Sequence, residues 1–391
     1  MTRPVPGVPH DGLESQLRTG VSFVSPSGPG SVQIMSGPDN ANGQEGKNQM
    51  RIIVDAMGGD NAPDEIVKGC LEALRRAEGF ELELIGDSAR IQTLLGNRDS
   101  RHERITVTHT TEIITNHDKP TEAIKRKKDS SLVVGMNRIK DKTGQAFISA
   151  GSTGALLAGS LLIPGRIKGV ARPALAPILP SASGGTMLID AGMNTVLRPV
   201  SYLQFGIMGS AYMHEIFGVE KPRVGLVNVG TEEGKGHSIV QEAYVLLKDS
   251  GLNFIGNIEG RDIAEGHVDV AVTDGFTGNA MLKMMEGTGK YLLDNLKQMY
   301  SRNFLTMLAA MLIKKELGVM KKKVDPEELG GTPILGIDGM IFKCHGNSKA
   351  KAITNTILKI GNGACLAVTE QIRSAFQAEG TVETIDTGGF A

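Results

Sequence analysis

The sequence predicts an α/β fold in three layers, in which helices cover both faces of a mainly parallel sheet. Two observations carry this prediction. Short runs rich in β-branched residues alternate with segments of helical periodicity between residues 50 and 378, an order that builds parallel sheets covered on both faces. Glycine supplies 50 of the 391 residues and gathers directly after these runs, where a strand turns into a helix.

The two ends of the chain lack this alternation. Residues 1–49 are rich in glycine, proline and serine and have no apolar periodicity, a composition that cannot offset its ordering entropy by burial. We expect a disordered N-terminal extension and no signal peptide, because no continuous apolar run follows a basic start. Residues 379–391 are expected to form a flexible tail, which leaves residues 50–378 as the folded domain.

The domain is expected to begin with a strand followed by a helix. The first strand is expected at residues 51–55, and Pro63, Asp64 and Glu65 then suit the first turn of a helix, where proline fits and acidic groups face the positive end of the helix dipole. Further strands, most of them followed by helical periodicity, are expected at residues 81–86, 105–110, 145–150, 186–190, 223–230, 253–257, 268–274 and 340–346.

A segment at about residues 290–329 interrupts the pattern. Phe304, Leu308 and Met311 belong to an apolar stripe, and lysines cluster just after it between residues 314 and 323. We expect an inserted helical hairpin here. The stripe has two interpretations, a core-facing helix with a solvated basic end or a basic amphipathic helix that touches a membrane surface.

The composition excludes several classes of protein. With 42 basic against 43 acidic side chains, the chain lacks the basic excess of a general nucleic-acid binder. No run of about 18 apolar residues is present, which argues against a transmembrane helix. Cys70, Cys344 and Cys365 are too few and too scattered for a disulfide framework or a zinc site, so we expect a reducing, cytoplasmic setting.

Six glycine-containing segments follow expected strands, at residues 55–63, 149–159, 190–194, 228–236, 273–281 and 344–352. The carboxyl ends of parallel strands lie at one edge of a sheet, where ligands bind, and each helix start there offers unpaired N–H groups. A single loop can use glycine simply for a tight turn. Six such loops together predict a crevice that binds an anion of the phosphate type.

Commoner functional motifs are absent. Residues 230–236 resemble a P-loop, but only three residues separate Gly230 from Gly234 and the Ser or Thr that would hold magnesium is missing. Ser152 lacks the glycine two residues earlier that a nucleophile elbow needs. Cys344 next to His345 suggests a thiolate nucleophile, yet neighbours on a strand point to opposite faces. No dinucleotide fingerprint, HExxH motif or His/Cys cluster indicates a nucleotide or metal site.

Longer motifs carry a resemblance to a known family. In order, the chain contains IIVDAMGGDNAP, ISAGSTGALLAGS, RIKGVARPALAPILP, NVGTEEGKG, NFIGNIEGRDI, DGFTGN and GTPILGIDG, from about residue 50 to about residue 360. These motifs resemble the bacterial phosphate acyltransferases of phospholipid synthesis, the PlsX family. The resemblance implies a fold similar to phosphotransacetylases and to isocitrate/isopropylmalate dehydrogenases, and a homodimer with no organic cofactor or metal.

The resemblance also implies a reaction, in which inorganic phosphate attacks the thioester of a fatty acyl group on acyl carrier protein. The products are free carrier and acyl phosphate, which a membrane glycerol-3-phosphate acyltransferase consumes. Because phosphate is itself the nucleophile, the protein need only position it and stabilise the tetrahedral oxyanion with N–H, Asn or Ser donors. Three alternatives stay open: a short-chain phosphotransacetylase that uses coenzyme A, a decarboxylating dehydrogenase, and a peripheral membrane scaffold anchored by the stripe.

The candidate site combines these arguments. Catalytic candidates, as donors to the oxyanion, are Asn279, Asn194 and Ser152. Phosphate and the thioester are expected next to Ser152, Thr153, Thr277, Gly278 and Asn279, with Asp55, Gly58, Gly59 and Asn61 as another wall. Asp55 and Asp274 have the alternative role of bracing loops, because an acid that faces phosphate must be protonated or paired.

A docking surface for acyl carrier protein, which is acidic, should be locally basic. Arg126, Lys127 and Lys128 form one candidate patch. The lysines of residues 314–323 form a second, and an ordinary solvated run of charge is the alternative for each.

One loop departs from the usual sequence of the family. Met193 replaces a small alanine, Val196 replaces an acid, and Val200 with Ser201 replaces a Glu-His pair. The loss of these polar groups leaves the role of the loop open.

Overall fold

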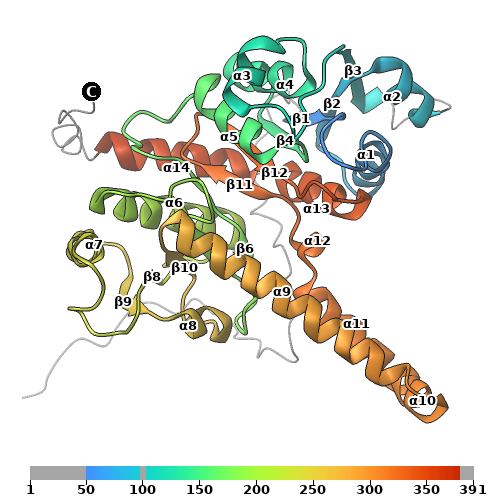
Figure 1. Cartoon of the computed structure of the whole chain (residues 1–391). Coiled ribbons are helices and arrows are strands. Elements are labelled where there is room, and N and C mark those ends of the chain that lie inside the picture. Colours follow the sequence, from blue (N-terminus) through green and yellow to red (C-terminus); the bar gives the residue numbers. More distant parts are fainter. Residues whose placement is uncertain (1–49, 97–102, 379–391) are drawn as a thin grey trace, which may run out of the picture. The chain divides into compact units, whose positions relative to one another are not determined.

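The computed structural model describes residues 50–96 and 103–378. The expected N-terminal extension (residues 1–49) and tail (379–391) lie outside the described residues. Strands and helices alternate along most of the chain (Figure 1). The first half contains β1 (Met50–Asp55), α1 (Asp64–Arg76), β2 (Phe80–Gly86), α2 (Ser88–Leu95), β3 (Ile105–His109), α3 (Pro120–Arg126), α4 (Ser131–Lys140), β4 (Ala146–Ser149), α5 (Thr153–Leu162), β5 (Ala174–Leu175), β6 (Ile178–Leu179) and β7 (Thr186–Ile189).

The second half begins with a long helix and ends with two more. It contains α6 (Pro199–Phe217), β8 (Val224–Val227), α7 (Ser238–Lys248), β9 (Phe254–Ile258), α8 (Gly260–Glu265), β10 (Val270–Val272), α9 (Gly275–Tyr300), α10 (Phe304–Leu312), α11 (Lys314–Val324), α12 (Pro326–Leu329), β11 (Thr332–Leu335), β12 (Met340–Lys343), α13 (Ala350–Gly361) and α14 (Ala364–Ala378).

Two sheets form the framework. The first has seven strands in the order β3-β2-β1-β4-β12-β11-β5, and the second has five in the order β6-β7-β10-β8-β9. Strands β3, β2, β1, β4 and β12 pair in parallel, as do β7, β10, β8 and β9. Within the described residues, the antiparallel pairs are β11 with β12 and with β5, and β6 with β7. The expected α/β fold with mainly parallel sheets is confirmed.

Sequence reasoning missed β5, β6 and β11. β5 and β6 have two residues each, which is too short for a periodicity to be visible, and prolines stand between and beside them. β11 contains Pro333, which has no N–H to donate to a ladder. β11 nevertheless pairs with β12 and with β5, and the carbonyl of Pro333 accepts from the Ala176 N–H.

Helices cover both faces of the first sheet, and the strand period of two decides which side chains they meet. On β1, Ile52 and Val54 enter the cluster that α1 and α13 cover, whereas Ile53 enters the cluster formed with α3, α4 and α5. Successive side chains of a strand point to opposite faces. The two clusters therefore fix which side chains of β1 face each side of the sheet.

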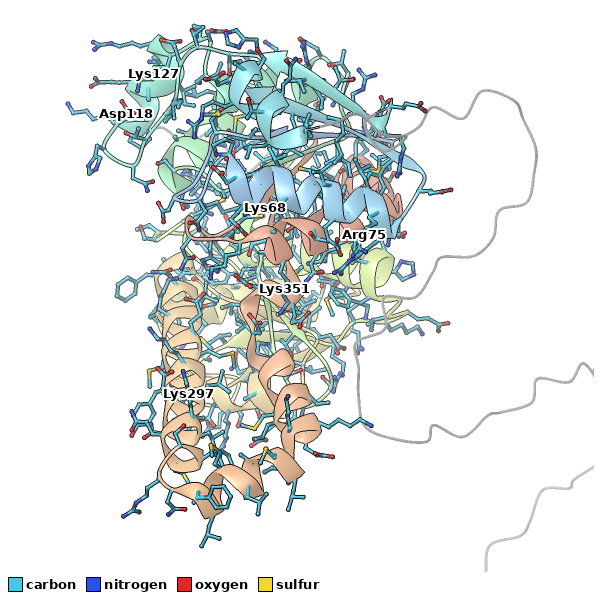
Figure 2. The ribbon with its side chains drawn as sticks, turned by 90° about the vertical axis from the view of Figure 1, so that its right-hand side faces the viewer. Lys68, Arg75, Asp118, Lys127, Lys297 and Lys351 are labelled. Carbon is cyan, nitrogen blue, oxygen red and sulfur yellow. The ribbon has the colours of Figure 1, made fainter. Side chains whose placement is uncertain are left out.

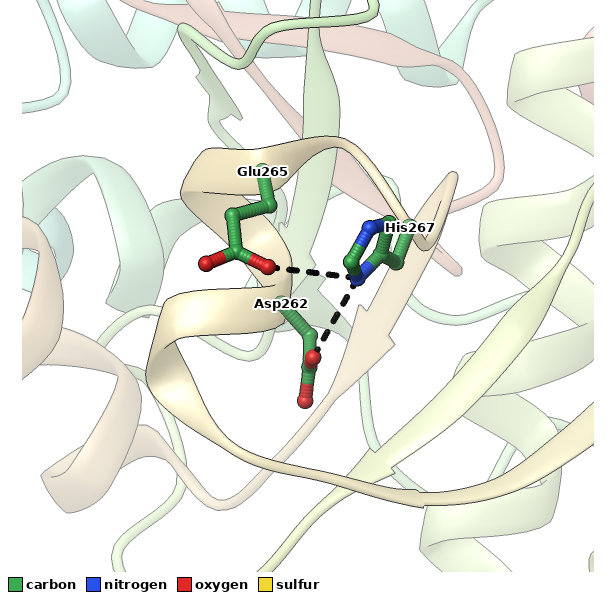
Figure 3. Close-up of side chains that lie close together, drawn as sticks. All are labelled: Asp262, Glu265 and His267. Carbon is green, nitrogen blue, oxygen red and sulfur yellow. Dashed lines mark hydrogen bonds and ion pairs between the residues drawn. The ribbon is translucent and has the colours of Figure 1, made fainter.

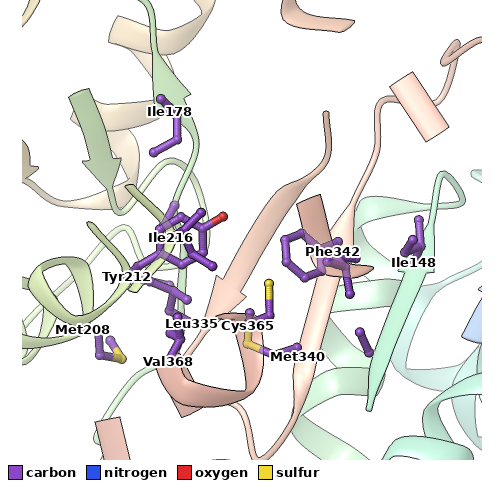
Figure 4. Close-up of a cluster of buried hydrophobic side chains, with 14 of the residues drawn as sticks. Ile148, Ile178, Met208, Tyr212, Ile216, Leu335, Met340, Phe342, Cys365 and Val368 are labelled. Atoms are coloured by element: carbon purple, nitrogen blue, oxygen red, sulfur yellow. The ribbon is translucent and has the colours of Figure 1, made fainter. Parts of the chain in front are cut away.

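The larger core cluster joins the two sheets. Figure 4 shows Tyr212 of α6, which packs on the second sheet, in the same buried cluster as Phe342 of β12 and Val368 of α14. Tyr212 and Phe342 are completely buried. At roughly 25 cal/mol per Å² of apolar surface, side chains of this size contribute strongly to keeping the two sheets together.

Helices α9, α10 and α11 occupy the segment where the helical hairpin is expected. The helix α9 has 26 residues and begins at the end of β10, and α10 contacts both α9 and α11 (Figures 1 and 2). Phe304, Leu308 and Met311 of α10 are 70%, 44% and 57% exposed, so these side chains do not enter the core of this chain. Among the described residues, no helix combines the length and apolar character needed to cross a membrane.

Candidate active site

A cavity of about 1060 Å³ lies at the carboxyl ends of strands from both sheets. Residues that follow or end four parallel strands line it: Thr153 after β4, Gly192 after β7, Asn279 after β10, and Lys343 and His345 at the end of β12. Other polar lining residues, among them Lys283, Glu286 and Lys359, come from helices. Strand ends that converge in this way make the usual ligand site of an open α/β sheet. Three of the six glycine-containing loops thus contribute polar side chains, and a fourth contributes Gly192.

The remaining lining of the cavity is largely apolar. It includes β6, α8, α12 and one side of α9. The apolar lining residues are Leu157, Leu175, Pro177, Ile178, Leu179, Ile263, Met281, Leu282, Met285, Leu292 and Leu329. A few polar groups in a largely apolar lining suit a ligand with a small polar head and a long hydrocarbon chain.

Asp55 braces the loop that carries Ser152 and Thr153. Its side chain is only 2% exposed and accepts hydrogen bonds from the hydroxyls of Ser131 (2.6 Å) and Ser149 (2.7 Å). The Ser149 hydroxyl in turn accepts from the Gly151 N–H at 3.0 Å. Burial raises the pKa of Asp55, and these hydrogen bonds oppose that rise. Asp55 does not line the cavity, so the bracing role is the one its contacts support.

The loop after β1 packs beneath the loops that line the cavity. A Cβ atom on Gly58 would lie 2.4 Å from an Asp55 carboxylate oxygen and 2.8 Å from the Gly151 nitrogen. Gly59 has a φ of +106°, a backbone conformation that favours glycine. Asn61 donates from its amide to the carbonyl of Asn347 at 3.0 Å. These residues shape the β4 and β12 loops from below and do not line the cavity.

Ser152 and Thr153, at the start of α5, have different surroundings. Ser152 is the N-cap: its hydroxyl accepts from the Ala155 N–H, and its side chain is 8% exposed. Thr153 is exposed and lines the cavity. Of these two expected phosphate ligands, Thr153 is therefore the one that a ligand in the cavity would meet.

Lys343 is a cavity residue that the sequence analysis did not identify. Its ammonium donates to the carbonyl of Gly151 at 2.8 Å and to that of Ala150 at 3.4 Å. Burial lowers the pKa of Lys343, while Cys344, Asp55 and Asp60 act in the opposite direction. The residue ends β12, directly before the glycine-containing segment at residues 344–352, but a single lysine at a strand end gives no signal by itself.

The start of α9 is built tightly. Asp274 caps the helix by accepting from the N–H groups of Phe276 and Thr277, both at 2.9 Å, and from the Thr277 hydroxyl at 2.7 Å. A Cβ atom on Gly278 would lie 2.0 Å from the Asp190 carbonyl oxygen. Glycine is required here because α9 approaches the β7 loop so closely.

Thr277 and Asn279 face different hollows. Asn279 lines the main cavity, whereas Thr277 lies in a smaller hollow with Tyr202 and His237. The cause is helical geometry, because residues two apart point to nearly opposite sides of a helix. The expected phosphate set is therefore brought together only in part.

Asn194 holds the β7 loop in place. Its amide donates to the Pro173 carbonyl at 2.8 Å and to the Asp190 carboxylate at 3.0 Å. Asp190 is fully buried, accepts further N–H groups from Leu175 and Met193, and has a pKa raised by burial. Asn194 does not line the cavity, so its contacts support a positioning role.

Two charged side chains of α9 stand next to His345. Glu286 contacts His345 Nε2 at 3.6 Å through one oxygen and Lys283 at 2.8 Å through the other, and all three residues line the cavity. Burial lowers the pKa of His345, although Glu286 opposes this. Cys344 is 2% exposed, and burial raises its pKa, so it is an uncharged thiol near neutral pH.

One cluster of acidic and histidine side chains outside the cavity is accounted for by local structure. Asp262, Glu265 and His267 lie together on the surface (Figure 3), with His267 Nδ1 3.4 Å from Asp262 and 3.5 Å from Glu265. Asp262 also accepts from the Glu259 N–H at 2.8 Å as part of the cap of α8. This cap explains the position of the acid without a bound ion.

The expected basic patch is partly neutralised. Lys127 donates to Asp118 and to the Ile113 carbonyl, both at 2.8 Å, and Figure 2 shows Lys127 and Asp118 close together. Arg126 and Lys128 are exposed. In the loop whose sequence departs from that of the family, Val196 is 80% exposed and Ser201 only 3%. Met193 packs beside the core cluster that contains Ile53. Nothing in the structure gives these substitutions a catalytic role.

The fold and the cavity together define a class of protein, an α/β enzyme that handles an anion next to a long apolar group. Comparison with known proteins makes this specific. A family model described as "Fatty acid synthesis protein" matches residues 50–371. A phosphate acyltransferase of Acetivibrio thermocellus is 51% identical over 327 residues, covering 84% of this chain and 96% of that one. One of Oceanobacillus iheyensis is 44% identical, covering 85% and 99%. The chain belongs to this phosphate acyltransferase family and is an acyltransferase.

Solved structures of low sequence identity support the fold. The EutD phosphotransacetylase from Staphylococcus aureus matches with a TM-score of 0.52 and 14% identity, over 81% of this chain and 95% of that one. A phosphotransacetylase from Streptococcus pyogenes gives 0.53 and 16%, over 81% and 94%. The expected likeness to phosphotransacetylases is confirmed for the fold, and the likeness to isocitrate/isopropylmalate dehydrogenases stays a prediction.

Proposed function

We propose that the protein transfers a fatty acyl group from acyl carrier protein to inorganic phosphate and releases acyl phosphate for phospholipid synthesis. One observation supports this proposal: Lys343, Thr153 and Asn279 line the same cavity, whose other lining residues are largely apolar. A phosphate among these polar groups and an acyl chain along α9 would bring nucleophile and thioester together. No protein nucleophile is required, and the buried thiol of Cys344 is poorly suited to be one.

The reaction follows from positioning. A phosphate oxygen attracted by the positive charge of Lys343 and held by the first turn of α5 attacks the thioester carbon, and the C–S bond then breaks. Holding the two reactants in this geometry accounts for about 7–11 kcal/mol of barrier reduction. The Asn279 amide would donate to the oxyanion, a contribution of about 3 kcal/mol. The leaving thiol has an ordinary pKa of about 8.5, so it needs no strong acid.

Asp55, Gly58, Gly59, Asn61 and Asn194 act in this proposal as positioning residues. Their contacts hold the loops after β1, β4, β7 and β12. Loop positions matter because a shift of about 1 Å at a reacting group can cost about 100-fold in rate. Ser152 and Thr277 would contribute through the helix starts that they complete.

The acyl donor is proposed to dock on the basic patch of Arg126 and Lys128, with Lys127 held by Asp118. An acidic carrier would be steered there by its charge. Substitution of Arg126 and Lys128 by glutamate should raise the KM for palmitoyl carrier protein and leave the KM for phosphate unchanged. An unchanged KM for the carrier would remove this patch from the proposal. Exchanging palmitoyl carrier protein for acetyl-coenzyme A as donor separates the carrier-dependent enzyme from a short-chain phosphotransacetylase.

The exposed apolar stripe of α10 supports a peripheral membrane contact. Phe304, Leu308 and Met311 would enter the interfacial region, with Lys314 and Lys315 following at the start of α11. Such a contact would bring acyl phosphate to the membrane glycerol-3-phosphate acyltransferase. Liposome flotation of the intact protein tests it against a Leu308→Asp, Met311→Asp variant, and equal flotation of the two proteins would count against the stripe. The homodimer that the family resemblance implies is testable by light scattering.

The decisive experiment is an assay of phosphate-dependent release of free carrier thiol from palmitoyl carrier protein. Acyl phosphate would be trapped with hydroxylamine in the same reaction. Thiol release without phosphate, or without a trapped acyl group, would overturn the proposed reaction.

A further inference from the structure

Lys359 of α13 is a buried cation in the wall of the same cavity. Its side chain is 6% exposed, and it lines the cavity beside Leu329, Gly330 and Cys344. Its ammonium donates to the Leu329 carbonyl. Within residues 50–96 and 103–378, no carboxylate lies within ion-pair distance of this ammonium. A buried charge without a counter-charge is costly, and such a group in a cleft is a candidate for function.

The surroundings of Lys359 raise the fraction of uncharged amine above that of an ordinary lysine. The neighbouring titratable groups are the Cys344 thiol, directly after β12, and the Cys365 thiol of α14, both buried. Burial lowers the pKa of Lys359 to about 8, and burial raises the pKa of both thiols, that of Cys365 to about 12. The nearby acids Asp325 and Glu328 pair with Lys351 instead, at 2.8 and 2.9 Å.

A neutral amine is a nucleophile, and the proposed reaction produces an acylating agent in the same chamber. We propose that Lys359 is a self-acylation site, at which the side-chain amine takes a fatty acyl group from acyl phosphate. This inference rests on the proposed function. The Leu329 carbonyl binds one N–H of the amine, and among the described residues no group donates to its lone pair.

The chemical step balances without a further reagent. The Nζ lone pair forms a bond to the acyl carbonyl carbon, and the bond between that carbon and the phosphate oxygen breaks. The leaving phosphate takes the electron pair, and the amine gives up one proton to phosphate or water. Nothing is oxidised or reduced. The product is an Nε-acyl-lysine whose hydrocarbon chain occupies the apolar cavity, so the modified enzyme is closed to its acyl donor.

Modification of this kind would make the enzyme sensitive to its own product. When acyl phosphate is consumed quickly, it leaves the cavity before the amine reacts. When it accumulates, the amide forms and does not reverse in water, so activity declines in proportion to the acylated fraction. Lys343, also in the cavity, is a poor competitor because its ammonium donates to the carbonyls of Gly151, Ala150 and Cys344.

The test adds chemically prepared palmitoyl phosphate to the full-length protein, followed by intact mass measurement and peptide mapping. One acyl group per chain is expected at Lys359. The initial rate should rise about tenfold between pH 7 and pH 9, because the neutral fraction of an amine with a pKa near 8 rises by that factor. A Lys359→Arg variant should lose this modification, and Lys351→Arg on the exposed side of α13 should keep it.

The outcomes separate this inference from the proposed function. Unmodified Lys359 in the folded wild-type protein, or equal acylation of Lys343 and exposed lysines, overturns the acylation site. These mapping results require no variant to fold. Independently, trapping of acyl phosphate from palmitoyl carrier protein and phosphate reports on the enzyme reaction, so the proposed function can stand while the acylation site fails.

Discussion

Replacing Lys343 by methionine tests the phosphate site directly. The change removes the one cavity lysine that donates to the Gly151 and Ala150 carbonyls while keeping a long side chain. A hydrogen bond from a charged donor contributes about 1.5–3 kcal/mol. This free energy corresponds to a loss of about 10- to 150-fold in kcat/KM for phosphate.

The stability of the variant must be measured alongside. The Gly151 carbonyl loses a partner, which costs about 1–3 kcal/mol when no water replaces it, whereas removing a buried cation offsets part of this loss. Chemical unfolding gives the net change in free energy. The activity assay follows release of the carrier thiol at saturating palmitoyl carrier protein while phosphate is varied.

A matched control is Lys142→Met. Lys142 is 58% exposed and pairs with Asp338 at 3.0 Å on the surface, so its loss changes the net charge equally but leaves the cavity intact. The KM for phosphate should stay unchanged in this control. A folded Lys343→Met protein with wild-type kcat/KM for phosphate would refute the assignment of Lys343 to the phosphate site.

Three further predictions concern packing, pH and the thiol. Gly278→Ala should abolish activity and destabilise the fold by more than about 3 kcal/mol in thermal unfolding, because the added Cβ would lie 2.0 Å from the Asp190 carbonyl oxygen. The control Gly287→Ala, on the same helix with nothing within 4 Å of its Cβ, should be neutral or slightly stabilising. Equal effects of the two substitutions would contradict the steric argument. Burial lowers the pKa of Lys359 from 10.5 to about 8, so between these pH values the unfolded chain binds more protons than the folded protein. The free energy of unfolding should therefore rise with pH in this window, by up to about 3 kcal/mol. Urea titrations should find a smaller rise in Lys359→Met, and identical pH profiles of the two proteins would argue against the lowered pKa. Cys344→Ala should retain phosphate-dependent thiol release within about tenfold, whereas complete loss in a folded variant would indicate covalent catalysis.

Much of the fold could be predicted from local patterns, because alternation and periodicity are local. Strand β1 illustrates this: Ile52 and Ile53 fall into different clusters as a period of two requires. The glycine-containing loops could also be placed at one edge, since parallel strands bring their carboxyl ends together. Gly278 shows that one such glycine answers a steric need at the site.

The missing part of the site depends on contacts between distant segments. Lys343 and Lys359 reach the cavity because β12 pairs with β4 and α13 packs against α1 and α12. The residues that flank the two lysines in the sequence do not predict these contacts. Thr277 shows the opposite error. It belongs to the right motif, but the turn of α9 directs it into another hollow than Asn279. Sequence proximity therefore identified the loops more reliably than the side chains.

The unbroken length of α9 has a mechanical consequence. Asn279 near its start lines the cavity, and Tyr300 ends it just before the exposed stripe of α10. At 1.5 Å per residue the helix separates these two points by roughly 30 Å. The helix acts as a rigid spacer. If the stripe of α10 binds a membrane or a partner, the length of α9 therefore sets the distance between that binding surface and Asn279. An acyl chain that lies along α9 already points along the axis that joins the two.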